Sequence, residues 1–291
     1  VKKTVITHKG TIDTYDKLIL ATGSSPFMPP LHGIDKVGVF AYRTIEDLQQ
    51  MEEFGKTAKK AVVIGGGLLG LEAAKALLDM QLETHVVEFA DRLMPRQLDT
   101  RGATILKDKL TSLGLHIHTS KSTKEVLGDN KINGLSFADG SVLDCDMLVV
   151  SAGIRPRDEL AKNSGIGIGS RGGIEVNNKL QTNYPDIFAI GEVALHQEMI
   201  YGLVAPGYEM AEVVATLLCG DNQASFNGFD MSTKLKLIGV DVASFGDALD
   251  MDEECVPIVY ENKAKGIYKR INITRDGKYL KGGILVGEGD G

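Results

Sequence analysis

Three glycines stand at the spacing Gly65-x-Gly67-x-x-Gly70, between an apolar run, Ala61 to Ile64, and a helical segment, Leu71 to Met80. Gly65 would make a tight strand-to-helix turn, Gly67 would let the backbone approach a pyrophosphate, and Gly70 would allow close helix packing. The free N–H groups at the start of such a helix bind phosphates. The segment therefore predicts a dinucleotide site rather than an ordinary glycine-rich turn.

An acidic residue, Glu88, ends the next predicted strand, Thr84 to Glu88. A carboxylate at this place accepts hydrogen bonds from the adenosine ribose hydroxyls and repels a 2′-phosphate. NADH is thus favoured over NADPH, although Arg92 lies close enough in sequence to keep NADPH open. Leu69 lies within the glycine segment and is counted as a cofactor contact. Glu72 lies on the first helical turn, where a carboxylate is also favoured by the helix dipole alone.

Two further strand ends carry small residues, Ala21-Thr22-Gly23 and Ser151-Ala152-Gly153. A third candidate strand, Asp186 to Ile190, runs into Gly191-Glu192. Small residues let a ligand approach the carboxyl edge of a parallel sheet, and a carboxylate there can hold a polyol hydroxyl. Each of these three features is also compatible with ordinary loop chemistry. Alternating strands and helices predict a three-layer α/β fold.

Other local patterns predict individual elements. Thr44 and Asp47 predict a capped helix start, and a second helix is expected from about Tyr208 to Leu218. The Lys9-Gly10 turn predicts that strand 4–7 pairs with strand 15–20. Asp276-Gly277 predicts a hairpin near the end of the chain.

The ordered motifs resemble those of the FAD-dependent pyridine-nucleotide oxidoreductases. The segments YDKLILATGSSPFMPPLHG, VVEFADRLMPRQLD and YGLVAPGYEMA are most similar to the NADH-dependent nitrite reductase large-subunit family. The resemblance implies two Rossmann-like dinucleotide-binding three-layer domains and a small α+β C-terminal domain. It also implies that a hydride passes from NADH to FAD, and that electrons continue to iron–sulfur and sirohaem centres of nitrite reduction, in nitrate assimilation.

The same resemblance implies roles for individual positions. Those expected to contact FAD are Ala21, Thr22, Gly23, Arg43, Gly191 and Glu192, with Glu192 at the ribityl chain. Those expected to contact NAD are Gly65, Gly67, Leu69, Gly70, Glu72, Glu88, Ala152, Gly153 and Ile154, with Glu72 near the nicotinamide amide. No catalytic acid or base is expected, because the two cofactors carry the chemistry of hydride transfer.

The resemblance also implies domain boundaries and a missing part. We expect a partial FAD domain over residues 1–42 and 157–228, an NAD domain over 43–156 and a small C-terminal domain over 229–291. No second glycine fingerprint precedes Thr4, so the chain is expected to be a fragment with a truncated FAD domain and weak or absent FAD binding. The three scattered cysteines cannot hold an iron–sulfur or sirohaem centre.

Composition narrows the function classes. With 32 basic and 39 acidic residues the formal charge is −7, which gives no basic footprint for nucleic acid. No apolar run is long enough for a membrane span, and the isolated cysteines favour a reducing, cytoplasmic setting. His116 and His118 share a strand face, but no third ligand is evident, so we expect no metal site. A homodimer is compatible with the resemblance.

Alternative functions remain open at this level. The electron acceptor could instead be a ferredoxin or rubredoxin, or oxygen as in an NADH oxidase. From another class, the chain could be a non-catalytic nucleotide-binding module.

Overall fold

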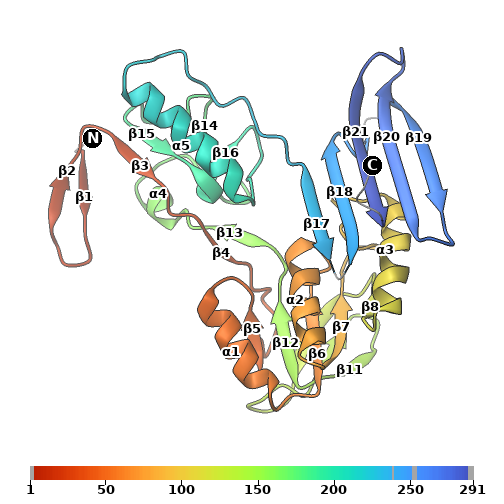
Figure 1. Ribbon diagram of the computed structural model, residues 1–291. Helices are drawn as coiled ribbons and strands as arrows, with labels where there is room; N and C mark the ends of the chain where they lie inside the picture. Colours follow the sequence, from red (N-terminus) through yellow and green to blue (C-terminus); the bar gives the residue numbers. More distant parts are fainter. Residues whose placement is uncertain (1–2, 238, 251–253, 288–291) are drawn as a thin grey trace. The chain divides into compact units, whose positions relative to one another are not determined.

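The computed structural model describes residues 3–237, 239–250 and 254–287. Its contacts divide the chain into two compact units, each interrupted in sequence (Figure 1). The first unit comprises Val1–Ser25 and Ile154–Phe229, and the second comprises Pro26–Gly153 and Asp230–Gly291. The C-terminal strands thus share a unit with the central segment of the chain, and the finer domain boundaries predicted from the sequence stay a prediction.

A parallel sheet of five strands organises the second unit, in the order β5-β12-β6-β7-β8. The strands are β5 (Val39–Ala41), β12 (Met147–Val150), β6 (Lys60–Ile64), β7 (Glu83–Val87) and β8 (His116–His118). The apolar run predicted as a strand forms β6, whose residues Ala61, Val62 and Val63 are fully buried. Strands covered on both faces have this near-continuous apolar character.

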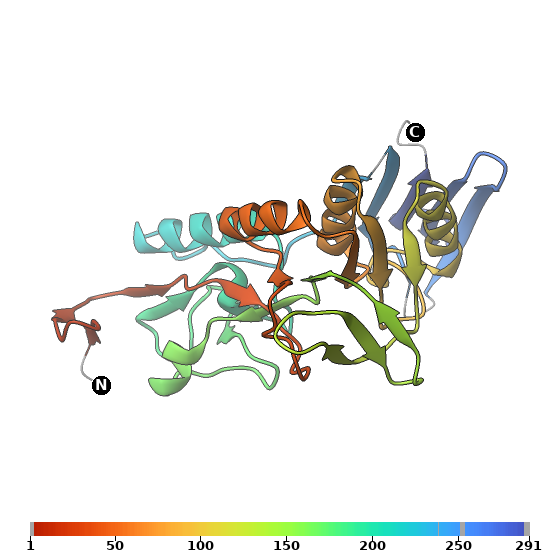
Figure 2. The ribbon, with the colours of Figure 1, turned by 90° about the horizontal axis from the view of Figure 1, so that it is seen from below.

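Helices and a β-meander cover the two faces of this sheet. The helices are α1 (Ile45–Gly55), α2 (Leu68–Asp79) and α3 (Thr100–Ser112). Side chains of α2 and α3 share one apolar core with the sheet, including Leu71, Leu77, Val63 and Leu106. The other face packs on the meander β9 (Thr123–Leu127), β10 (Gly134–Phe137) and β11 (Val142–Asp144) through a second core, which Figure 2 shows in yellow-green opposite the helices.

The C-terminal part is an antiparallel sheet in the order β17-β18-β21-β20-β19. Its strands are β17 (Thr233–Leu237), β18 (Val240–Gly246), β19 (Cys255–Asn262), β20 (Ile267–Thr274) and β21 (Leu280–Gly287). The predicted Asp276-Gly277 hairpin connects β20 to β21. The helical layer against this sheet comes from α2 and α3, because Tyr268 and Val286 belong to the same core as those helices.

The first unit is built from short strand pairs and helices. Its strands are β1 (Thr4–Ile6), β2 (Ile12–Thr14), β3 (Leu18–Leu20), β4 (Ser24–Pro26), β13 (Ile154–Pro156), β14 (Ile174–Val176), β15 (Ile187–Ala189) and β16 (Ala194–His196). Its helices are α4 (Glu159–Asn163), the short 3₁₀ helix η1 (Gly191–Val193) and α5 (Val204–Leu218).

The prediction that the first strand pairs with the segment 15–20 is wrong. Strand β1 pairs with β2, while β3, in the segment that the turn signal assigned to β1, pairs in parallel with β15. The apolar β3 gains a buried neighbour in β15, whose residues Ile187, Phe188 and Ala189 are all buried. A local turn signal cannot anticipate a partner so distant in sequence.

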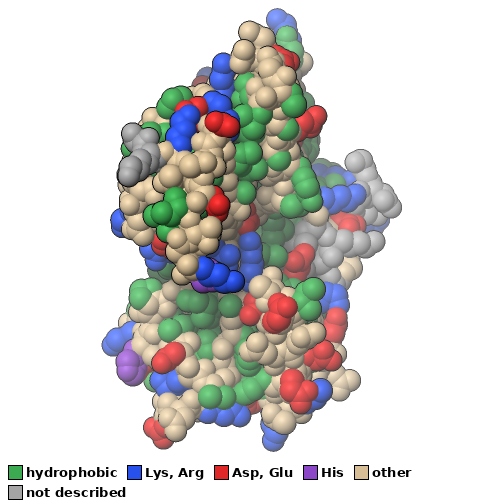
Figure 3. All heavy atoms as spheres, turned by 90° about the vertical axis from the view of Figure 1, so that its left-hand side faces the viewer, with side chains coloured by type: hydrophobic (Ala, Val, Ile, Leu, Met, Phe, Trp, Pro, Cys, Tyr) green, Lys and Arg blue, Asp and Glu red, His purple; other side chains and the backbone are tan. Residues whose placement is uncertain are grey.

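The surface agrees with the composition. On the face in Figure 3, acidic and basic side chains are interspersed among apolar and neutral ones. Among the helices that the structure describes, none is both long and apolar enough to cross a bilayer.

Candidate dinucleotide sites

Four strand ends of the parallel sheet bring residues predicted to contact NAD to one edge, together with Arg43, which was predicted to contact FAD. Because β5, β12, β6 and β7 run parallel, the residues that follow them lie along the same carboxyl edge. These residues are Tyr42 and Arg43 after β5, Ser151 to Gly153 after β12, Gly65 after β6, and Glu88 after β7. In doubly wound α/β folds, ligands bind at this edge of the sheet.

Each of the three glycines of the fingerprint is required for a different structural reason. Gly65 has φ of 115°, and a Cβ atom there would lie 2.2 Å from the carbonyl oxygen of Ser151. A Cβ atom at Gly70 would lie 1.9 Å from the carbonyl oxygen of Gly65. Gly67 has no heavy atom within 4 Å of the corresponding position. Gly65 and Gly70 therefore allow the tight turn and the close packing, while Gly67 leaves open space for a ligand.

The N-terminus of α2 lacks a side-chain cap. Gly67 is its N-cap residue, and among the described residues no side chain forms a capping hydrogen bond there. By contrast, α1 begins with the predicted capping box, in which Thr44 and Asp47 bond to each other's backbone. The first N–H groups of an α-helix have no partner within the helix. At α2 they are available to a phosphate, whose negative charge the helix dipole favours.

Glu88 is oriented towards the glycine turn by backbone donors. The N–H of Gly66 donates to Oε2 of Glu88 at 2.6 Å, and the N–H of Ala90 donates to Oε1 at 2.7 Å. A carboxylate oxygen accepts more than one hydrogen bond, so each still has capacity for a ribose hydroxyl. The half-buried carboxylate beside an open helix N-terminus fits the adenosine ribose and pyrophosphate of NADH.

Two neighbours of Glu88 refine this region. Arg92, which kept NADPH open, donates to the carbonyl oxygens of Leu98 at 3.1 Å and Pro95 at 3.4 Å, and pairs with Asp91. Its guanidinium is thus engaged within its own loop. Phe89, which was not among the residues predicted from the sequence, follows Glu88 and has 78% of its surface exposed. An aromatic residue directly after the predicted ribose-binding acid was the available signal.

A small cavity of about 270 Å³ lies at the β5 end of the same edge. Tyr42, Arg43, Thr44, Leu48 and Leu69 line it, which brings two of the predicted residues together. Burial raises the pKa of Tyr42, and the nearby negative charge of Glu72 raises it further. Glu72 therefore lies close to the Tyr42 side chain, so that three elements, β5, α1 and α2, converge there.

In the first unit, a second carboxyl edge joins five of the six residues predicted to contact FAD, whereas the sixth, Arg43, belongs to the second unit. Ala21, Thr22 and Gly23 follow β3, and Gly191 and Glu192 follow its parallel partner β15. The Thr22 hydroxyl donates to the carbonyl oxygen of Arg157 at 2.7 Å, and the Ser24 hydroxyl donates to Oε2 of Glu192 at 2.7 Å. The positions of Gly23 and Gly191 are open where a Cβ atom would point.

Helix α5 begins beside Gly191, again without a side-chain cap. Its N-cap is Leu203, and in the described part of the chain no side chain caps its start. A Cβ atom at Gly207 would lie 3.5 Å from Cα of Gly191. The helix starts at Val204, earlier than predicted, and Pro206 in its first turn was the missed start signal. This edge thus carries a second open helix N-terminus next to a glycine and a carboxylate.

The remaining predicted residues lie where the chain leaves β12. Ala152 and Gly153 are exposed, and Gly153 has φ of 108° and accepts from the N–H of Phe27 at 2.9 Å. Ile154 begins β13, with its Cδ1 atom 3.6 Å from where a Cβ atom of Gly202 would lie. Ala152 and Gly153 therefore adjoin Ser151, which contacts the glycine turn.

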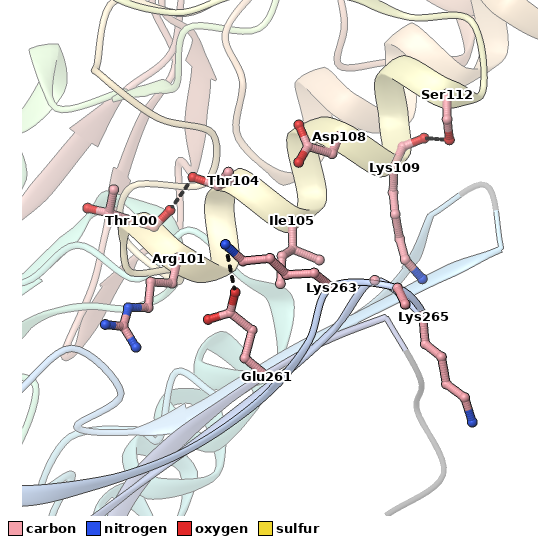
Figure 4. Close-up of a pocket in the computed structure, with 12 residues that line it drawn as sticks. Thr100, Arg101, Thr104, Ile105, Asp108, Lys109, Ser112, Glu261, Lys263 and Lys265 are labelled. Atoms are coloured by element: carbon pink, nitrogen blue, oxygen red, sulfur yellow. Dashed lines mark hydrogen bonds and ion pairs between the residues drawn. The ribbon is translucent and has the colours of Figure 1, made fainter.

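A cavity of about 750 Å³ lies between α3 and the β19–β20 turn (Figure 4). Mostly polar and charged side chains line it, and none of the predicted site residues is among them. Lys263 pairs with Glu261 at 3.6 Å, and Ser112 donates to the carbonyl oxygen of Lys109, so these groups satisfy one another. We assign no ligand to this cavity.

Comparisons with known proteins agree with this architecture. The model of the pyridine nucleotide-disulphide oxidoreductase family matches residues 1–213, and that of the rubredoxin NAD+ reductase C-terminal domain matches residues 232–290. The NAD(P)H nitrite reductase large subunit of Klebsiella oxytoca is 54% identical over 94% of this chain and 28% of that protein. The NADH nitrite reductase large subunit of Escherichia coli is 47% identical over 99% of this chain and 34% of that protein.

A solved structure gives the same result for the fold. The NAD-dependent persulfide reductase from A. fulgidus has a TM-score of 0.89 and 28% identity, over 99% of this chain and 57% of that chain. The chain spans about a third of the length of the nitrite reductase subunits it matches. The predicted α/β fold and the resemblance to nitrite reductase large subunits are confirmed, and the chain belongs to the pyridine nucleotide-disulphide oxidoreductase family.

Proposed function

We propose that this chain is the NADH- and FAD-binding module of a longer oxidoreductase, in which a hydride passes from NADH to FAD. The observation that carries the proposal is the open N-terminus of α2, with free space at Gly67 and an oriented carboxylate at Glu88. This combination matches the phosphates and ribose of a dinucleotide. The family membership and the names of the relatives support an oxidoreductase over a non-catalytic binding module.

At the NADH site, each group has a separate role in the proposal. The α2 N–H groups hold the pyrophosphate, while Glu88 accepts from the adenosine ribose hydroxyls and disfavours a 2′-phosphate. The engagement of Arg92 by its own loop supports the preference for NADH. Phe89 offers an exposed ring on which adenine can stack. Leu69, Glu72, Ala152, Gly153 and Ile154 would border the nicotinamide half.

At the FAD site, the edge formed by β3 and β15 supports the proposal. Ala21, Thr22 and Gly23 would face the cofactor, Glu192 would bind its ribityl hydroxyls, and Arg43 would face the flavin. Gly191 offers open space, and the start of α5 beside it offers N–H groups that no N-cap side chain satisfies. FAD, when bound, accepts the hydride and passes electrons onward singly or in pairs.

For the onward step we propose nitrite reduction in the longer protein, by way of iron–sulfur and sirohaem centres. Its support is the identity to two nitrite reductase large subunits. The alternative is transfer to a separate rubredoxin- or ferredoxin-type protein, which the match of the C-terminal domain favours, or to oxygen. We further propose a cytoplasmic protein, and a homodimer as its assembly.

The test uses the complete native protein loaded with FAD. Under anaerobic conditions, stoichiometric NADH is expected to bleach the flavin absorbance, and added nitrite is expected to restore it. Unbleached flavin would contradict the NADH-to-FAD step. If NADH bleaches the flavin and rubredoxin or oxygen, but not nitrite, restores its absorbance, the NADH-to-FAD step is supported and nitrite is not the acceptor.

A further inference from the structure

A cluster of imidazoles and a carboxylate lies at the β7–β8 edge of the parallel sheet. In the pairing of these strands, His85 lies opposite His116, and Val87 opposite His118. Because side chains two apart in a strand share a face, His85, His116, His118 and Glu83 all project from one face. The rings of His85 and His116 stack with centroids 4.5 Å apart. His85 is only 6% exposed, whereas Glu83 and His116 are exposed.

Hydrogen bonds within the cluster indicate where the ring protons lie. Nε2 of His85 is 3.0 Å from Oε1 of Glu83, and Nδ1 of His85 is 2.9 Å from Nε2 of His118. Because an ionised carboxylate only accepts, we assign the proton of His85 to Nε2, so that its Nδ1 accepts from His118.

We propose that Glu83, His85 and His116 bind a divalent transition-metal ion of the Zn²⁺ class, with His118 orienting the His85 ring. One ligand atom from each of the three residues lies within 4.8 Å of the other two. Ligands about 2.1 Å from a tetrahedral zinc are about 3.4 Å apart, so the exposed His116 ring must turn out of its stack on His85 to direct a nitrogen at the metal. Two imidazoles, a carboxylate and a water are a ligand set that zinc accepts.

His118 supplies the supporting contact that such sites need. A histidine that binds a metal normally donates its other ring N–H to a fixed partner. When the metal occupies Nε2 of His85, the Nε2 proton of His118 passes to Nδ1 of His85, which then donates to His118, and Nδ1 of His118 takes up from solvent the proton that leaves Nε2 of His85. The metal thus replaces the proton that His85 shares with Glu83.

Lys60 is the competitor for the site. Its Nζ atom lies 2.9 Å from Oε1 of Glu83, and the hydrogen bonds from His85 and then Lys60 lower the pKa of Glu83 to about 2. The Lys60 side chain is 30% exposed and can turn to solvent when a cation replaces it. Removing its charge is therefore expected to tighten metal binding.

The site lies on the strand that carries Glu88 but contains none of the proposed nucleotide ligands. The N–H of Glu88 donates to the carbonyl oxygen of His118 at 2.8 Å. A metal that joins β7 to β8 would stabilise this sheet edge. The metal-site proposal does not depend on NADH or FAD binding.

The experiment measures Zn²⁺ binding by calorimetry and, with Co²⁺ as the probe, by visible absorption of the tetrahedral ion. A Cys255→Ser background removes the thiol of a second potential group, Asp247, Asp250 and Cys255. We expect one Zn²⁺ per chain, at least tenfold weaker binding in His116→Ala, and about tenfold weaker binding in His118→Gln. Lys60→Gln is expected to bind several-fold tighter.

The matched control is His32→Ala, because His32 also faces a carboxylate, Glu125, at 2.8 Å but is outside the cluster. Its affinity should stay within about twofold of the parent. His116 is exposed, so His116→Ala is expected to retain its metal-free thermal midpoint. The proposal is overturned if Zn²⁺ does not saturate, if His116→Ala binds as the parent does, or if His32→Ala weakens binding equally.

Discussion

Helices α2 and α3 belong to the same unit, but their N-termini are capped differently. At α3, the Asp99 carboxylate accepts from the N–H of Gly102 at 2.9 Å and also from the Tyr268 hydroxyl and Arg270. At α2, the N-cap is Gly67, and no side chain that the structure describes caps the helix there. At the N-terminus of α3 the protein itself therefore supplies the negative charge, whereas the N-terminus of α2 is open to a negatively charged ligand.

This contrast separates structural from functional use of the same helix property. Asp99 connects α3 to strand β20 of the C-terminal sheet, and its side chain is only 18% exposed. The α2 terminus, next to the oriented Glu88, lacks such an internal partner among the described side chains. Changes at α3 should thus alter stability, and changes at α2 should alter nucleotide binding.

The largest effect is expected for Gly70→Val. Its Cβ atom would lie 1.9 Å from the carbonyl oxygen of Gly65, so the turn and helix must separate. We expect NADH binding, followed by fluorescence titration, to fall by more than 100-fold, or the chain to lose its cooperative thermal transition. Gly67→Ala is the control, because that position has open space, and it should fold normally. Unchanged binding in Gly70→Val would refute the close-packing role.

The next largest effect is expected for Asp99→Ala. It removes an N-cap, worth about 0.5–2 kcal/mol, and leaves Tyr268 and Arg270 without their carboxylate, for a total of about 2–3 kcal/mol. Denaturant unfolding measures this loss. NADH affinity should stay within about twofold, since Asp99 lies outside the α2 terminus. A large loss of affinity at unchanged stability would reverse the assignment of the two helices.

Glu88→Ala is expected to act on binding rather than on stability. Loss of the ribose acceptor should weaken NADH by about tenfold, equivalent to about 1.4 kcal/mol. NADPH should lose less or gain, because the repulsion of its 2′-phosphate disappears. Parallel titrations with NADH and NADPH measure the ratio of the two dissociation constants. Equal losses for NADH and NADPH would argue against Glu88 as the discriminating residue.

The smallest effect concerns the pH dependence of the α3 cap. Burial of Asp99 opposes its ionisation, but hydrogen bonds from Tyr268, Gly102 and Arg270 outweigh burial, and the net pKa lies below the ordinary value of 3.8. The carboxylate therefore contributes its full stability above pH 3.8, and that contribution is lost as the pH falls through the lowered value. Unfolding free energies of the parent and Asp99→Ala should converge below pH 3.8. A constant difference would contradict the shift.

The sequence predicted the glycine turn because its requirements are local: a buried strand, three glycines, a helix and a following acid. The capped start of α1 is local in the same way, and the structure contains both Thr44–Asp47 bonds. The pairing of β3 with β15 was not predicted, because its parallel partner lies far along the chain and the nearby Lys9-Gly10 turn suggested another.

Features that depend on strand register were also beyond the sequence. His116 and His118 were visible as a pair, but their approach to His85 and Glu83 requires the alignment of β7 with β8. The bond from Gly66 to Glu88 likewise needs two adjacent strand ends. Phe89 could have been singled out from its place after the acid, whereas its exposure could not.

The measurement that tests the central claim most directly is NADH affinity together with thermal stability in Gly67→Asp. This variant gives α2 the kind of carboxylate that α3 has, at a position with φ of −84° where an added Cβ atom would meet no heavy atom of a non-neighbouring residue within 4 Å. The account predicts at least tenfold weaker NADH binding, because the carboxylate caps the N–H groups and repels the pyrophosphate, with a thermal midpoint equal to or above the parent's. Unchanged NADH affinity in a stably folded Gly67→Asp protein would contradict it.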